Sequence, residues 1–198
     1  MSSQRRVDVA AGKRAARVRA LAARDALPPA ERALLSAAIC ARAAALPELR
    51  RAQTVLLFAS FRSEVDTGAL LAEMLARGAT VALPRVLAPR VLEAVRVADP
   101  AADLAPGAWG IPEPRPGLPV IEPGGFDAVV VPGAAFSASG ARCGYGGGFY
   151  DAYLPRLRAG TPRVALAFEA QLVDDLPTAA HDVPVDVIVT EARTIRPR

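Results

Sequence analysis

The chain has few of the residues that bind structural metals or form disulfides. It contains two cysteines, Cys40 and Cys143, which lie far apart, and a single histidine, His181. Because a structural zinc site needs about four such ligands at close spacing, we do not expect one. Both cysteines are expected to be reduced thiols, which indicates a cytoplasmic protein.

Long apolar runs are also absent. Apolar residues make up 52% of the 198 residues, but much of this fraction is alanine. Each run ends well before the roughly 20 residues that a membrane span requires. The N-terminus is polar and contains arginines, without the apolar centre of a secretory signal. We therefore expect neither a membrane-spanning segment nor a signal peptide.

Aromatic residues are scarce, at 5% of the chain, while the formal net charge is +4 and comes mostly from scattered arginines. Proteins that bind nucleic acids commonly interleave basic residues with aromatic ones that stack on bases. That pattern is missing, so we expect no nucleic-acid partner. An anionic small substrate explains the positive charge as well.

Familiar catalytic motifs are missing too. There is no G-x-x-x-x-G-K-[ST], and the glycines do not follow G-x-G-x-x-G, since Phe149 stands where the last glycine belongs. A P-loop nucleotidase and a nicotinamide-dependent dehydrogenase are therefore excluded. A Ser-His-Asp hydrolase is not expected either, because the chain has no G-x-S-x-G motif.

The most informative segment is a glycine cluster. Residues 144, 146, 147 and 148 are all glycine, between an apolar run at 126–131 and a predicted helix at 149–158. A glycine loop between a strand and a helix directs backbone N–H groups, backed by the positive end of the helix dipole, toward an anion. The alternative is a flexible loop that serves no ligand.

Two charged residues flank this loop. Arg142 precedes it and offers the forked guanidinium that suits phosphate. Asp151 follows it and offers a carboxylate for a divalent metal beside the phosphate. The alternative for Asp151 is that it helps to cap the helix.

Apolar runs and turn residues along the chain predict alternating helices and strands. Residues 1–12 lack a clear pattern and are expected to fray, and residues 99–125 are expected to form a long surface loop. Helices are predicted at 13–25, 29–45, 66–76 and 149–158. Strands are predicted at 54–59, at 80–83 (ended by Pro84), and at 91–97, 126–131, 163–168 and 185–190.

This alternation predicts one α/β domain over residues 1–198, with an N-terminal helical extension. Its sheet is expected to be open, mostly parallel and the middle of three layers. Ligands of such sheets bind at the carboxyl ends of the strands.

Four further segments hold candidate site residues. Lys13 and Arg17 are four positions apart and share a helix face, which fits either an anion site or a solvated basic face. Glu64 follows the first predicted strand and is placed either to accept hydrogen bonds from a ligand or to lie on the surface. Trp109 either stacks on a flat heterocycle or anchors the long loop. Asp182 is a second carboxylate for a metal held by Asp151.

Taken together and in this order, these segments resemble the 5-formyltetrahydrofolate cyclo-ligases, also called 5,10-methenyltetrahydrofolate synthetases. The resemblance covers residues 13–191, and its most specific element is G-A-R-C-G-Y-G-G-G-F-Y-D at 140–151. Weaker elements are K-R-A-A-R at 13–17, E-V-D-T at 64–67, G-I-P-E-P at 110–114 and H-D-V-P-V-D at 181–186.

The resemblance implies a NagB/RpiA/CoA-transferase-like fold and an ATP- and Mg²⁺-dependent reaction. In that reaction 5-formyltetrahydrofolate becomes 5,10-methenyltetrahydrofolate through a phosphorylated formyl intermediate, and ADP and phosphate are released. The implied partners are two small-molecule substrates, a reduced folate and ATP. The protein is expected to be a monomer.

The resemblance also implies roles for individual residues. Arg142 and Tyr150 are the candidate catalytic residues, and Asp151 and Asp182 are the candidate metal ligands. The candidate ATP site is Lys13, Arg17, Arg142, Cys143, Gly144, Tyr145, Gly146, Gly147, Gly148, Phe149 and Tyr150. The candidate folate site is Ala59, Glu64, Trp109, Tyr145, Gly146, Gly147, Gly148 and Phe149.

The chain departs from some family members at two of these positions. Gly147 stands where some have lysine, so phosphate contacts there fall to the backbone and Arg142. Ala59 stands where larger side chains also occur. Two alternatives are a paralogue with the same fold that acts on another formyl-amine or phosphate substrate, and a non-catalytic nucleotide- or RNA-binding module.

Overall fold

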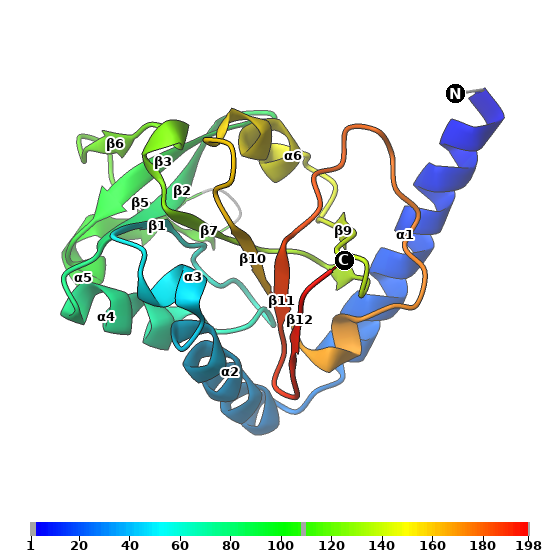
Figure 1. Cartoon of the computed structure of the whole chain (residues 1–198), viewed down its shortest axis with the longest axis horizontal. Coiled ribbons are helices and arrows are strands. Elements are labelled where there is room, and N and C mark those ends of the chain that lie inside the picture. The colour runs from blue at the N-terminus through cyan, green and yellow to red at the C-terminus, as the bar shows by residue number, and fades with distance from the viewer. Residues whose placement is uncertain (1–2, 108–109, 198) are drawn as a thin grey trace.

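The fold is described from a computed structural model, which describes residues 3–107 and 110–197 (Figure 1). Trp109, a candidate folate contact, lies outside the described residues. At the centre is a mixed eight-stranded sheet with the order β12-β11-β10-β7-β1-β2-β3-β6. Its strands are β1 (Thr54–Leu56), β2 (Thr80–Ala88), β3 (Val91–Val97), β6 (Val120–Ile121), β7 (Ala128–Val131), β10 (Arg163–Leu166), β11 (Val187–Val189) and β12 (Thr194–Ile195).

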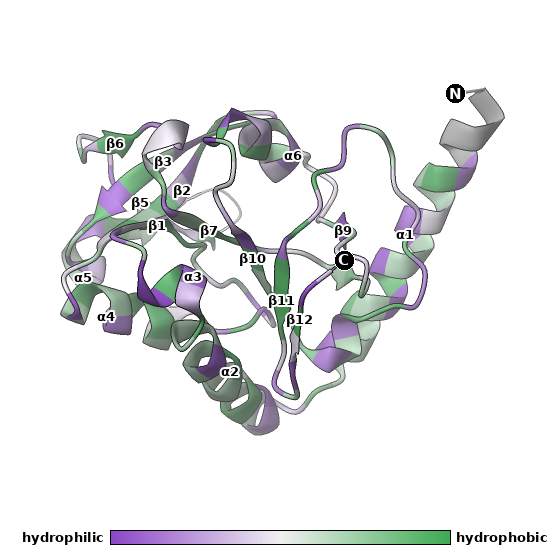
Figure 2. Cartoon of the chain, in the orientation of Figure 1, coloured by the Kyte–Doolittle hydropathy of each residue, from purple (hydrophilic) through white to green (hydrophobic). Residues whose placement is uncertain are grey.

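The middle of the sheet is parallel, as the sequence predicted. Strands β11, β10, β7, β1 and β2 pair in parallel, whereas β12, β3 and β6 add antiparallel pairs at the two sides. The parallel strands are short, almost fully buried apolar runs, typical of strands covered on both faces. Figure 2 shows β10 and β11 as hydrophobic segments within the core.

Helices cover both faces of the sheet. One apolar cluster joins alternate strand residues such as Val55 and Leu57 to α2 (Pro29–Ala44), α3 (Pro47–Arg50) and α4 (Gly68–Ala76). The other apolar cluster joins strand residues on the opposite face of the sheet, such as Leu56, to α6 (Phe149–Tyr153) and the 3-10 turn η3 (Leu154–Arg156). Figure 1 shows α2 and α4 below the strands and α6 above them. The period-two alternation of strand side chains therefore produces three layers.

The helix α1 (Ser3–Asp25) stands beside the sheet. It packs against the small hairpin of β8 (Ala135–Phe136) and β9 (Arg142–Cys143) and against η4 (Glu169–Gln171). Ala16 and Ala20 are buried there with Cys143. The helix begins at Ser3 rather than at Lys13, so the expectation of an irregular backbone is wrong for residues 3–12.

The predicted loop at 99–125 contains short ordered elements instead. These are α5 (Pro100–Asp103), β4 (Leu104–Pro106), β5 (Pro112–Pro114), β6 and the 3-10 turn η2 (Pro123–Gly125). Polar capping holds α5: the Asp99 carboxylate accepts the Ala101 N–H, and Asp103 accepts the N–H groups of Ala98 and Asp99. Strand pairing holds the short strands, since β4 pairs with β5 and β6 pairs with β3. Periodicity in the sequence does not reveal such elements.

Two predicted element ends were also wrong. Strand β2 continues through Pro84, although proline has no backbone N–H to donate to a neighbouring strand. On the edge of β2 that pairs with β1, the pairing ends at Ala82, so no strand opposite Pro84 needs that N–H. The helix after the glycine loop ends at Tyr153 rather than at residue 158. Pro155 explains this early end, because proline has no backbone N–H for a helical hydrogen bond and its ring clashes with the preceding turn.

None of the helices within the described residues is long and apolar enough to cross a membrane.

The core predicts a sharp contrast between two leucines. Leu70 in α4 is fully buried, whereas Leu34 in α2 is 73% exposed. We expect Leu70→Ala to lower the free energy of unfolding by about 2–5 kcal/mol, since it removes buried apolar contacts and leaves a cavity. Leu34→Ala should change it by less than about 0.5 kcal/mol. Urea unfolding of both variants checks this, and equal losses would contradict the assigned packing.

Candidate functional site

The glycine loop lies between β9 and α6. Gly146 and Gly148 have φ angles of 103° and 67°, a left-handed backbone that side chains rarely adopt. No described residue accepts a hydrogen bond from the backbone N–H groups of residues 144–148. The loop therefore presents a row of donors to whatever fills the space beside it.

Arg142 and Asp151 meet at the base of this loop. Arg142 is in β9, and its Nη2 lies 2.5 Å from Oδ1 of Asp151, which α6 carries. Asp151 also accepts the N–H of Val183 at 3.5 Å, and α6 has no side-chain cap. The capping alternative for Asp151 is therefore wrong, and its carboxylate faces the loop.

Lys13 forms the second ion pair of the site, with Asp182. The side chains of Lys13 and Asp182 are only 16% and 8% exposed. Asp182 also accepts the N–H of Ala179 at 2.6 Å, which fixes its carboxylate in the segment before β11. Since Val183 contacts Asp151, the two carboxylates predicted as metal ligands belong to neighbouring segments of one site.

Arg17 lies one helical turn beyond Lys13 on the same face of α1 and contacts the glycine loop directly. Its Nε donates to the Gly144 carbonyl at 2.8 Å, and its Nη2 lies 3.5 Å from Sγ of Cys143. Cys143 is buried, and its thiol donates to the Lys13 carbonyl at 3.6 Å. The helix α1 is thereby attached to the loop by both side-chain and backbone contacts.

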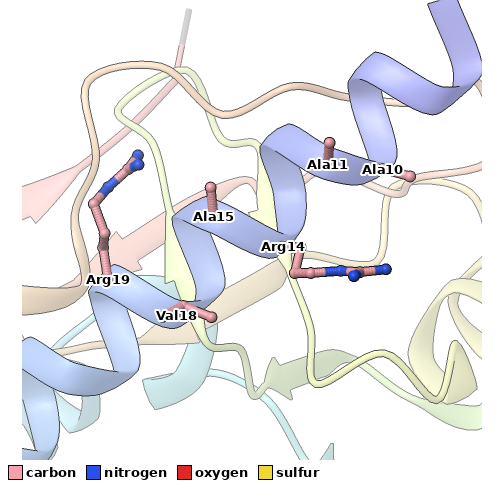
Figure 3. A pocket seen from close by; sticks show the side chains of 6 residues that line it. All are labelled: Ala10, Ala11, Arg14, Ala15, Val18 and Arg19. Atoms are coloured by element: carbon pink, nitrogen blue, oxygen red, sulfur yellow. The ribbon is translucent and has the colours of Figure 1, made fainter. Parts of the chain in front are cut away.

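Two other basic residues of α1, Arg14 and Arg19, lie away from the glycine loop. Arg14 and Arg19 line an open hollow on the outward face of the helix, together with Ala10, Ala11, Ala15 and Val18 (Figure 3). A single helix forms this hollow, and neither a carboxylate nor a glycine loop lines it. The glycine loop, where charged groups from several elements converge, is therefore the stronger candidate for a ligand site.

The Glu64 carboxylate already has hydrogen-bond partners within the protein. Its Oε2 accepts the Phe61 N–H at 2.9 Å, and its carboxylate hydrogen-bonds to Tyr145 of the glycine loop. Tyr145 also accepts a hydrogen bond from Arg24 at 2.7 Å. Burial raises the pKa of Glu64, and the Tyr145 and Phe61 hydrogen bonds and the Arg24 charge partly offset this.

Arg24 is a site residue that the sequence analysis missed. Its guanidinium is buried, at 4% exposure, and lies 5.8 Å from the centre of the Tyr145 ring. Nothing in the sequence distinguishes Arg24 from the other arginines of α1. Only the packing of the helix end against the glycine loop shows its position.

The remaining candidate residues surround these groups. The Tyr150 hydroxyl and the Arg142 Nε are buried and have no hydrogen-bond partner among the described residues, and the Arg142 guanidinium lies 6.0 Å from the Tyr150 ring. Burial, reinforced by the charge of Glu64, raises the pKa of Tyr150 far above its ordinary value, so its hydroxyl stays protonated. Phe149 packs against the core at the start of α6, and Ala59 is half-buried beyond β1.

The comparisons with known proteins show the family of the chain. The model of the 5-formyltetrahydrofolate cyclo-ligase family matches residues 9–191. The chain belongs to the 5-formyltetrahydrofolate cyclo-ligase family. It is 32% identical to the cyclo-ligase of Escherichia coli K12, over 86% of this chain and 95% of that one. It is 28% identical to the Mus musculus cyclo-ligase, over 93% and 96%.

A solved structure shows the same fold. The NMR structure of Aquifex aeolicus 5,10-methenyltetrahydrofolate synthetase is similar with a TM-score of 0.83 and 35% identity, covering 94% of this chain and 93% of that one. The activity is that of a 5-formyltetrahydrofolate cyclo-ligase, an ATP-dependent ligase of folate one-carbon metabolism. The alternatives of a paralogue with another substrate and a non-catalytic module are set aside.

The Lys13–Asp182 pair predicts a measurable stability effect. Asp182→Asn leaves the half-buried ammonium of Lys13 without a counterion. It should lower the free energy of unfolding by about 1.5–3 kcal/mol in metal-free, nucleotide-free buffer. Asp174→Asn is the control, since Asp174 is exposed in the same connecting segment. Urea unfolding measures both, and an equal effect would show that the pair adds no stability.

Proposed function

We propose that the glycine loop binds the phosphate groups of ATP. The observation that carries this proposal is the row of unpaired N–H groups at residues 144–148, bordered by Lys13, Arg17 and Arg142. Such donors and cations match the oxygens and charge of a triphosphate. Because α6 spans only Phe149–Tyr153, the positive charge comes from side chains rather than from a helix dipole.

Asp151 and Asp182 suit a magnesium ion beside those phosphates. The described residues contain no group of three or more His, Cys, Asp or Glu arranged for a metal. A pair of carboxylates fits Mg²⁺, which keeps several water ligands and takes others from substrate phosphates. When bound, the ion would neutralise charge on the phosphate oxygens. Lys13 and Arg142 would then exchange their carboxylate partners for phosphate oxygens.

The folate ring is proposed to bind against Glu64. A carboxylate at this depth can accept hydrogen bonds from the N–H groups of a pterin, and it accepts them most strongly while ionised. Tyr145 now occupies one hydrogen-bond position of Glu64. The other acceptor positions of the carboxylate are proposed to bind the pterin, with Ala59, Tyr145 and Phe149 as the proposed contacts of its ring.

The reaction we propose begins with attack by the formyl oxygen on the γ-phosphorus of ATP. The new O–P bond forms as the bond to the β-phosphate oxygen breaks, and ADP leaves. N10 then bonds to the formyl carbon and loses its proton, and phosphate departs with the former formyl oxygen. Arg142 and the loop N–H groups would stabilise charge on the transferring phosphoryl group. The protonated Tyr150 hydroxyl acts as a donor rather than as a base.

The remaining proposals concern the protein as a whole. We propose that it acts in the cytoplasm, as the free, buried thiols of Cys40 and Cys143 indicate. We also propose that it is a monomer. The large exposed apolar side chains among the described residues are scattered over several elements: Val18, Leu34, Leu87, Val91, Val120 and Tyr145.

Asp151→Asn tests the metal site. The amide keeps the shape of the side chain but removes its charge, so turnover should fall by at least about a hundredfold, while urea unfolding still shows a folded protein. When binding of an ATP analogue is measured at increasing magnesium concentrations, the affinity of Asp151→Asn should depend less on magnesium than that of the wild type. Near-normal turnover at limiting magnesium would contradict the proposed role of Asp151.

Glu64→Gln tests the folate site. The affinity for 5-formyltetrahydrofolate should fall by about tenfold or more, with little change for ATP, since a charge-assisted hydrogen bond is lost. Calorimetric titration of each ligand measures this. Equal losses for both ligands would argue against a folate-specific role.

The raised pKa of Glu64 adds a pH dependence to the wild-type protein. The carboxylate is ionised above its pKa, so folate affinity should be full at high pH. It should fall as the pH drops toward that pKa, which lies above the ordinary value of 4.5. Glu64→Gln should lack this decline, because its amide does not titrate.

A further inference from the structure

The turn between β2 and β3 carries an arginine to the glycine loop. Arg90 follows the end of β2, and β3 packs against α6, directly after the loop. A Cβ placed on Gly148 would lie 3.4 Å from Cζ and 3.5 Å from Nη1 of Arg90. The same construction on Gly146 meets the guanidinium of Arg17 at 3.8 Å. Two guanidinium groups thus border different positions of one loop.

Arg90 differs from Lys13 and Arg142 in having no counterion among the described residues. Lys13 pairs with Asp182 and Arg142 with Asp151. Over residues 3–107 and 110–197, Arg90 forms neither a hydrogen bond nor an ion pair. Arg17 contacts a carbonyl and a thiol but no carboxylate. The glycine loop therefore has an excess of positive charge at Arg17 and Arg90.

The backbone of Arg90 is also unusual. Its φ is 61°, in the left-handed region that few residues other than glycine adopt. Such conformations are costly and are concentrated at ligand-binding positions. At this turn the conformation holds an uncompensated guanidinium beside unpaired backbone donors.

We propose that Arg90 is a further phosphate-binding residue, which contacts the phosphate groups of ATP beside Gly148. This inference rests on the proposed ATP site at the glycine loop. A triphosphate carries several negative charges, and two uncompensated guanidinium groups at separate positions of the loop match an extended anion. The role is one of binding and charge neutralisation, from an element that the sequence analysis did not connect to the site.

Arg90→Asn is the variant for the test, because asparagine tolerates a left-handed backbone while the charge is lost. Arg62→Asn is its matched control: Arg62 has a φ of 56°, and its guanidinium lies over the Phe61 ring at 4.9 Å. The probes for calorimetry are a non-hydrolysable ATP analogue with magnesium, inorganic tripolyphosphate with magnesium, and 5-formyltetrahydrofolate.

We expect Arg90→Asn to weaken binding of both phosphate probes by about tenfold, as for one charge-assisted contact, and to leave folate binding unchanged. Arg90→Lys should recover part of the loss, and Arg62→Asn should bind both phosphate probes normally. Unchanged phosphate affinity in Arg90→Asn would overturn the inference. A loss confined to folate would also overturn it, since the arginine would then contact a folate carboxylate.

Arg17→Ala separates this inference from the proposed function. If Arg17→Ala weakens both phosphate probes while Arg90→Asn does not, the ATP site stands and only the role of Arg90 fails. If neither variant affects them, the placement of the phosphates at the glycine loop fails, and the inference fails with it.

Discussion

The attachment of α1 to the glycine loop is the contact on which the site depends. Lys13 pairs with Asp182, and Arg17 donates to the Gly144 carbonyl, across most of the length of the chain. These charges are partly withdrawn from water, so their mutual attraction exceeds that of a surface pair. In the proposed complex, phosphate and metal replace the same partners. The interactions that hold the free site together are therefore the ones that ligands must exchange.

The glycine loop needs this surrounding charge because its own helix is short. With α6 ending at Tyr153, the dipole behind the loop is weak, and in the proposed site anion binding depends on guanidinium and ammonium groups from other elements. Those elements are α1, β9 and the turn between β2 and β3. Glycine at positions 146 and 148 allows the left-handed backbone that the loop adopts there.

The core of the fold could be predicted because its strands are apolar runs too short for helices. Strands β1, β7, β10 and β11 all fall within predicted segments. The errors occurred where other forces decide the structure. Capping by Asp99 and Asp103 orders α5, at the start of the segment predicted as a loop, and the early end of β1 allows Pro84 inside β2. Neither the partner of a carboxylate nor the neighbour of a strand is visible in a hydropathy pattern.

By itself the sequence determined the order of the motifs, the family, and the positions of Arg142 and Asp151 on either side of the glycine loop. The tertiary structure alone decided that Asp182 pairs with Lys13 and that Tyr145 hydrogen-bonds to Glu64. It also decided that Arg24 and Arg90 reach the glycine loop. The physical reason is the distance along the chain between the residues that interact. Residue type and spacing control turns, caps and strand alternation, whereas contacts between distant segments follow from how whole helices and strands pack.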